Sequence, residues 1–374
     1  MAKNIVGHGP RRAEDGEFAA HPAGAKGRGT FSNISGRFER EHRVLIDDGW
    51  GTLDDDAPKL KTNVAIDATR SIIARNDSPD IPFDRSINPY RGCEHGCVYC
   101  FARPTHAYLG LSPGQDFESR LFVKPKAAQL LVQELRKPGY QVRTMALGTN
   151  TDPYQPIDEK YEVTRDILKV LRDFRHPVGI VTKSNRVLRD IDILAEMAKD
   201  NLARVAISIT TLDRELARTM EPRAPTPERR LDAIRELNAA GVSTSVMTAP
   251  MIPALNDHEM EAILARGYEA GARHAGYVVL RLPLEIKDLF REWLEAVQPG
   301  RAGHVMSLIR SMRGGKDYDA EWGKRMKGTG VYADLIANRF KLTCDRLGLN
   351  QWWTPLATDL FKPPPAAGDQ LRLL

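Results

Sequence analysis

Three of the chain's four cysteines lie within eight residues, in the order Cys93-x3-Cys97-x2-Cys100, with Tyr99 just before the last. Thiolates at such short spacing bind metals, and iron–sulfur clusters are usually held by four of them. Because no fourth cysteine lies nearby, the spacing predicts a four-iron cluster whose last iron stays open to another molecule. An open iron is a site of chemistry, so the motif predicts a reactive metal centre.

Two other interpretations of the motif remain. A zinc ion could take the three thiolates with His95, His106 or Cys344 as the fourth ligand, although structural zinc sites usually combine two half-sites. An iron–sulfur cluster could also serve only structure or electron transfer. Disulfides are disfavoured, since the chain has four cysteines in 374 residues and neither an apolar leader nor an apolar run of membrane-spanning length. We therefore expect a cytoplasmic protein with reduced thiols and no membrane partner.

Short apolar runs alternate with helical periodicity from about residue 86, which predicts βα units around a parallel sheet. The expected strands are 86–90, 144–148, 178–182, 204–209, 243–248 and 277–282. The expected helices are 126–137, 160–174, 187–199, 227–240 and 257–270. This pattern fits an α/β fold, a partial (β/α)6 barrel of the TIM type. It places the cysteine loop after the first strand, at the edge where such proteins build their sites.

The segments on either side of this core have a different composition. Residues 1–60 are rich in Gly, Arg, Asp and Pro and lack apolar periodicity, so we expect a largely disordered extension or one draped over the body. Residues 61–285 would form the barrel and 286–361 a helical extension. A polyproline stretch within 362–374 predicts a disordered tail.

The sequence around the cysteines resembles the radical S-adenosylmethionine superfamily, and in particular the group around spore photoproduct lyase. The resemblance rests on the cysteine spacing, on Asn88-Pro89-Tyr90-Arg91-Gly92 before it and on Phe101-Ala102-Arg103-Pro104 after it. It implies that Cys93, Cys97 and Cys100 hold a [4Fe–4S] cluster whose open iron binds S-adenosylmethionine. It also implies reductive cleavage to a 5′-deoxyadenosyl radical, with a flavodoxin or ferredoxin as electron donor.

The same resemblance implies contacts to S-adenosylmethionine at the strand ends. Tyr99 would lie beside the adenine, Lys183 would meet the methionyl carboxylate and Ser208 the ribose. The loop after the second strand would receive the amino group through Thr149, Asn150, Thr151 and Asp152, and Arg223 is a further candidate. Each has a plainer alternative, which is an Asx-type turn, a solvated lysine, a core serine or a surface ion pair.

One departure from spore photoproduct lyase concerns the hydrogen-atom donor. That enzyme uses a cysteine on the loop after the second strand, and Thr149 stands at the corresponding place here. The remaining thiol, Cys344, shares helical spacing with Ile336 and Phe340, which predicts a small buried side chain. The resemblance therefore implies radical chemistry, lyase-like or other, with the reaction unspecified.

Charge gives one further indication about partners. The net charge is +5, and a basic group occurs near aromatic residues Tyr318 and Trp322. Its members are Arg310, Arg313, Lys316, Lys324, Arg325 and Lys327. Such a group can bind phosphates and stack bases, so nucleic acid is one candidate substrate, and a zinc-binding nucleic-acid module is the alternative function. Near the cysteines, Arg103 and His106 could approach a substrate or face water.

Overall fold

A parallel sheet forms the centre of the molecule. The structure, a computed structural model, describes residues 5–6, 27–39, 46–47 and 60–365. Six parallel strands of the described chain stand side by side in chain order, with β4 (Ile73–Arg75) antiparallel at one edge. They are β5 (Arg85–Ile87), β8 (Met145–Leu147), β9 (Val178–Thr182), β10 (Ala203–Ser208), β11 (Ser243–Met251) and β12 (His274–Val279).

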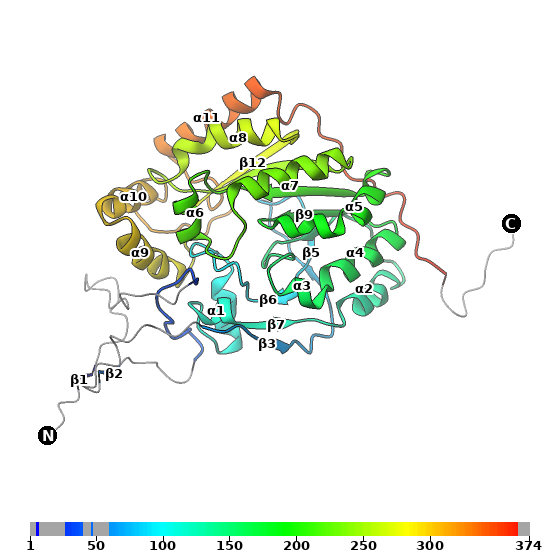
Figure 1. Cartoon of the computed structure of the whole chain (residues 1–374), viewed down its shortest axis with the longest axis horizontal. Coiled ribbons are helices and arrows are strands. Elements are labelled where there is room, and N and C mark those ends of the chain that lie inside the picture. The colour runs from blue at the N-terminus through cyan, green and yellow to red at the C-terminus, as the bar shows by residue number, and fades with distance from the viewer. Residues whose placement is uncertain (1–4, 7–26, 40–45, 48–59, 366–374) are drawn as a thin grey trace.

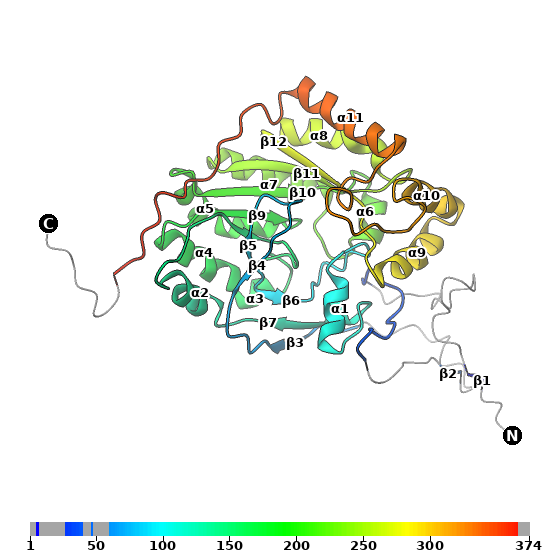
Figure 2. The same cartoon turned by 180° about the vertical axis from the view of Figure 1, so that it is seen from behind.

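Helices cover the outer face of this sheet (Figures 1 and 2). The longer ones are α2 (Ala127–Leu135), α4 (Val163–Asp173), α5 (Ile191–Ala198), α7 (Pro227–Ala239) and α8 (Met260–Glu269). Helix α4 shows why they pack this way, because Val163, Ile167 and Leu171 recur every four residues and are at most 4% exposed. Shorter helical segments lie between these strands and helices, namely α3 (Asp158–Tyr161), η3 (Asn185–Asp190), α6 (Arg214–Met220) and η4 (Asp257–Glu259).

The predicted βα alternation is confirmed, with each expected strand and helix present within a few residues. In the described chain the sheet ends at β4 and β12 without pairing between them, which is the partial barrel that the sequence predicted. The exact end points differ because terminal residues leave the hydrogen-bonded ladder where loops begin.

A second, smaller sheet lies beside the cysteine loop. It consists of β3 (Asn63–Ile66), β7 (Arg120–Val123) and β6 (Tyr90–Arg91). Between β6 and β7 the chain forms the cysteine loop, then η2 (Arg103–Leu109) and α1 (Asp116–Ser119). Sequence periodicity gave no sign of this sheet, since its strands are short and β3 is mostly exposed. In the remaining described residues, β1 (Ile5–Val6) pairs with β2 (Ile46–Asp47).

Residues 27–39 pack against the cysteine loop, although the sequence assigned them to a largely disordered extension. The Gly29 and Thr30 amides donate to the Glu118 carboxylate at 2.9 and 3.1 Å. A Cβ on Gly29 would come within 1.7 Å of the Gly96 carbonyl oxygen, so only glycine allows this approach. The part of residues 1–60 that is described therefore includes a segment draped over the site, and the rest of that prediction falls outside the described residues.

The C-terminal part adds helices and a return segment. Helices α9 (Ile286–Val297) and α10 (Pro299–Ser311) pack on each other, and α11 (Val331–Leu347) lies along α8 (Figures 1 and 2). Cys344 is 4% exposed on α11, as its spacing predicted. The chain then returns along the sheet, and the Lys362 amide donates to the Phe174 carbonyl at 3.0 Å. Residues 366–374 of the predicted tail fall outside the described residues. No described helix has the length and apolar character needed to span a membrane.

Candidate cofactor site

The three clustered cysteines lie on one buried loop. Two backbone hydrogen bonds shape it, from Gly96 N to Cys93 O (3.3 Å) and from Cys100 N to Cys97 O (3.2 Å). None of the three thiols forms a disulfide. Burial raises the pKa of each thiol, and for Cys93 the nearby Asp152, Cys97 and Cys100 raise it further. Thiols bind metals as thiolates, and the positive charge of a bound metal reverses this effect. A buried loop whose three thiols lie close enough to affect one another's pKa therefore suits a cationic metal group.

The donor type of the three cysteines is the one that an iron–sulfur cluster uses. A zinc ion needs its ligands about 2.0–2.3 Å from one point. Within the described ranges no three His, Cys, Asp or Glu side chains form a group that could hold a single metal ion. The cysteines of a four-iron cluster bind different irons, so a cluster does not require three sulfurs around one point.

Arg103 fixes the shape of the cysteine loop through hydrogen bonds to its backbone carbonyls. Its side chain is fully buried, and its guanidinium donates to Cys97 O at 2.9 Å and to Gly96 O at 3.0 Å. It also donates to Gly114 O and forms an ion pair with buried Glu118 at 2.5 Å. A guanidinium has five N–H donors in a fixed plane, which lets one side chain hold several carbonyls at once. Arg103 is therefore part of the framework, and the expectation that it meets substrate or water is wrong.

His106 is also buried, in contrast to the same expectation. Its Nε2 lies 2.9 Å from the Arg120 carbonyl oxygen, and its ring packs edge-on against Phe117. Burial lowers the pKa of His106 to about 4, so the ring is neutral near pH 7. His106 therefore holds η2, on which it lies, against the start of β7.

The loop after β8 is ordered by a side chain that the sequence reasoning overlooked. The Asn88 side-chain oxygen accepts from the amides of Asn150 (3.1 Å) and Thr151 (3.4 Å) and lies 3.5 Å from the Thr149 hydroxyl. The Thr151 hydroxyl is buried and donates to Tyr90 O. Gly148 has φ +85°, and a Cβ there would come within 1.8 Å of Val181 O. Three predicted ligands thus have roles in ordering this loop.

Asp152 joins this loop to β9 and to the cysteine loop. It accepts from the Thr182 hydroxyl at 2.7 Å and from the Lys183 amide at 2.8 Å, and His95 Nδ1 lies 3.4 Å away. Burial alone would raise the pKa of Asp152, but His95 and these hydrogen bonds outweigh it and lower the pKa to about 2. Asp152 is therefore a fixed carboxylate beside Cys93, able to attract an ammonium group.

Lys183 and Ser208 form a polar pair inside the barrel mouth. Lys183 Nζ donates to Ser208 Oγ at 3.0 Å and lies 5.6 Å from the Tyr99 ring centre. Ser208 Oγ in turn donates to Ala249 O at 3.1 Å. Burial lowers the pKa of Lys183. The structure thus brings close together Tyr99, Lys183 and Ser208, three residues that the resemblance implied as cofactor contacts.

Glu221 is the central residue that sequence reasoning missed. It is buried, accepts from the Tyr99 and Arg230 side chains and from the Thr210 hydroxyl (2.5 Å), and lies 3.9 Å from Lys183 Nζ. Burial raises the pKa of Glu221. The resemblance implied Arg223, two residues later in the chain, as the candidate. Only the packed structure shows that Glu221 faces inward and that the Arg230 guanidinium balances the charge of its carboxylate.

Arg223 lies against the cysteine loop, where its backbone amide donates to the His95 carbonyl at 3.3 Å. Arg223 Nη2 is 3.0 Å from Glu94 Oε1, and its side chain is 36% exposed. In the basic group, Arg310 pairs with Asp317, Lys324 with Glu321 and Arg325 with Asp80. Arg313 is buried and donates to Leu280 O. Three of these six cations are thus paired with carboxylates and a fourth is buried, so this segment is a weaker candidate for polyanion binding than its sequence indicated.

Comparison with known proteins identifies the family. The family pattern described as the Radical SAM superfamily matches residues 87–266, which run from β5 into α8. Uncharacterised proteins of Mycobacterium tuberculosis and Mycobacterium bovis are 39% identical over 232 residues, covering 62% of this chain and 68% of theirs. One from Methanocaldococcus jannaschii is 31% identical over 46% of this chain and 62% of its own.

A structure of a spore photoproduct lyase mutant has a similar fold. It aligns with a TM-score of 0.51 and 18% identity, over 76% of this chain and 80% of that one. The matched family region contains the cysteine loop and the strand ends that carry Asp152, Lys183 and Ser208. The chain therefore belongs to the radical S-adenosylmethionine superfamily, whose enzymes use a [4Fe–4S] cluster and S-adenosylmethionine.

Proposed function

We propose that Cys93, Cys97 and Cys100 hold the [4Fe–4S] cluster and that the strand ends beside them bind S-adenosylmethionine. The observation that carries this proposal is the joining of the cysteine loop, Asp152 and Lys183 at one edge of the sheet. With both groups bound, the chemistry they would supply is one-electron reduction of the sulfonium, which would break the C5′–S bond and release methionine and a 5′-deoxyadenosyl radical able to take a hydrogen atom from a substrate. A flavodoxin or ferredoxin is the proposed electron donor.

The residues of the site have complementary roles in this proposal. Asp152 is a buried carboxylate for the methionyl ammonium group, and Lys183 is a compact cation for the methionyl carboxylate. Ser208 offers a hydroxyl for the ribose. Tyr99, held by Glu221, forms a fixed apolar wall near the adenine. Fixed groups of this kind orient the bond that breaks and exclude water, while the cofactor supplies the reactivity.

The substrate is left open in this proposal. Thr149 carries no thiol, and Cys344 is buried on α11, so a hydrogen-atom donor of the spore photoproduct lyase kind is missing from the loop after β8. Repair of DNA by that route is therefore not proposed. The assay that tests the function is 5′-deoxyadenosine formation by reduced, cluster-loaded protein without added substrate. A loaded cluster with no such product would favour an electron-transfer or structural role.

Lys183→Met should weaken S-adenosylmethionine binding, because the variant has no buried cation to face the carboxylate. We expect the Kd to rise by about tenfold or more, corresponding to about 1.4 kcal/mol or more. Calorimetric titration of the oxygen-free, reconstituted protein measures this change. Lys169→Met is the matched control, since Lys169 is 46% exposed on α4 and pairs with Asp166. Equal affinity of the Lys183 variant and the natural protein would remove Lys183 from the site.

A further inference from the structure

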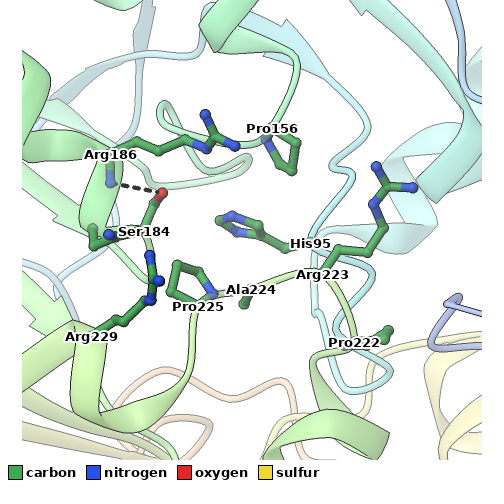
Figure 3. Close-up of a pocket in the computed structure, with 10 residues that line it drawn as sticks. His95, Pro156, Ser184, Arg186, Pro222, Arg223, Ala224, Pro225 and Arg229 are labelled. Atoms are coloured by element: carbon green, nitrogen blue, oxygen red, sulfur yellow. Dashed lines mark hydrogen bonds between the residues drawn. The ribbon is translucent and has the colours of Figure 1, made fainter.

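A cavity of about 460 Å³ opens beside the cysteine loop (Figure 3). Segments that follow three successive strands form its walls, namely Pro156 after β8, Ser184 and Arg186 after β9, and residues 222–225 with Arg229 after β10. His95, from the cysteine loop itself, completes the lining. Neither a cysteine nor Lys183 lines this cavity, so it is separate from the groups proposed above to bind the cofactors.

Three guanidinium groups give the cavity its chemical character. Figure 3 shows the His95 ring between Arg186 and Arg223, with Arg229 on the opposite wall beside Pro225. Arg186 pairs with Glu159, whose side chain is 71% exposed, and Arg223 pairs with Glu94. The Arg229 side chain has no carboxylate partner within ion-pair distance in the described part of the chain.

These existing pairs leave donors for a ligand. A guanidinium has five N–H groups, so one ion pair with Glu159 or Glu94 occupies only part of its capacity. An exposed pair such as Arg186–Glu159 is worth about 0–1 kcal/mol and is readily exchanged for a stronger anion. Arg229 adds a positive charge that no carboxylate of the described chain balances. The cavity is thus a concave site prepared for an anion.

We propose that this cavity binds a phosphate ester, either a phosphodiester of a polynucleotide or the phosphate of a free nucleotide. Arginine forks match phosphate oxygens in pairs, and a phosphate has enough oxygens to accept from more than one guanidinium. A concave site of this size suits such a group better than the flat face of an acidic protein. Because the cavity lies against the cysteine loop, the nucleoside attached to a bound phosphate would lie beside the cofactor site. The phosphate ester would then belong to the substrate, which rests on the proposed function.

The test compares binding by reconstituted protein of the natural sequence and of the Arg186→Gln/Arg229→Gln variant. A fluorescein-labelled thymidine oligomer of about 12 nucleotides is the first probe, followed by fluorescence anisotropy. Thymidine monophosphate and polyglutamate are the competitors. Arg235→Gln is the matched control, because Arg235 lies on α7, is 62% exposed and pairs with Asp232 outside the cavity.

We expect the double variant to raise the oligomer Kd by about tenfold or more and the control by less than about twofold. The slope of log affinity against log salt should fall by about 0.7 for each phosphate that the variant no longer neutralises. Competition by the monophosphate at similar concentration identifies a free nucleotide as the source, and much weaker competition identifies the polymer.

Three results would overturn the inference: no binding of either nucleotide probe, equal binding by the double variant, or equal competition by polyglutamate. Formation of 5′-deoxyadenosine without substrate is measured on the same samples. If the double variant still forms 5′-deoxyadenosine, the proposed function stands even where the phosphate site does not.

Discussion

Replacement of any one of Cys93, Cys97 and Cys100 by Ala should leave the protein folded but almost free of iron after oxygen-free reconstitution. The natural protein should hold about four irons per chain, as a four-iron cluster requires. With three protein ligands, the removal of one leaves a cluster held by two thiolates and two open irons, which dissociates readily. The measurement is iron and sulfide content together with the visible spectrum.

Cys344→Ala is the control for these variants. Cys344 is buried on α11, away from the cysteine loop, and its replacement removes a thiol without removing a proposed ligand. It should keep full iron content and a normal spectrum. A Cys97→Ala protein with a stable, fully loaded cluster would contradict the ligand assignment, and a fall in iron content on replacing Cys344 would move the fourth thiol into the site.

Arg103→Met should lower the free energy of unfolding of the metal-free protein by about 3 kcal/mol. The change removes a fully buried guanidinium and leaves the Glu118 carboxylate with only the amides and hydroxyl of residues 29 and 30. It also frees the Gly96 and Cys97 carbonyls that shape the cysteine loop. Urea unfolding measures the change in free energy, and we expect iron loading to fall as well.

Two further variants make this result specific. Arg120→Met removes an arginine that is 54% exposed and pairs with Asp116 at 3.7 Å, and it should cost less than about 1 kcal/mol. Arg103→Met combined with Glu118→Gln removes the unpaired charge and should recover part of the stability. If Arg103→Met matches the natural protein in both stability and iron loading, Arg103 does not hold the loop.

The sequence predicted the fold well because its signals are local. Apolar runs such as 178–182 are bounded by polar turns, and α4 repeats its apolar residues every four positions. The cysteine spacing is also a local signal, whereas it is the resemblance that singles out Lys183 at the end of β9. Tyr99, Lys183 and Ser208, which the resemblance implied as cofactor contacts, lie near one another because parallel strands bring their ends to one edge.

The residues that sequence reasoning missed act across long separations. Glu221 reaches Tyr99, which is 122 positions away, and Asn88 orders a loop more than 60 positions later. Arg103 could not be recognised as buried because its partner Glu118 lies in a short helix without periodicity. The approach of residues 27–39 depends on Gly29 meeting a backbone carbonyl, and composition alone does not reveal such an approach.

The most direct test of the account is the electron paramagnetic resonance spectrum of the reduced, oxygen-free protein before and after S-adenosylmethionine is added. Three cysteine ligands leave one iron open, so coordination of S-adenosylmethionine should change the spectrum of the cluster. We predict a brown protein whose signal shifts on addition, and almost no cluster signal in Cys→Ala variants of the motif. A colourless protein containing zinc, or a cluster signal that S-adenosylmethionine leaves unchanged, would contradict the account.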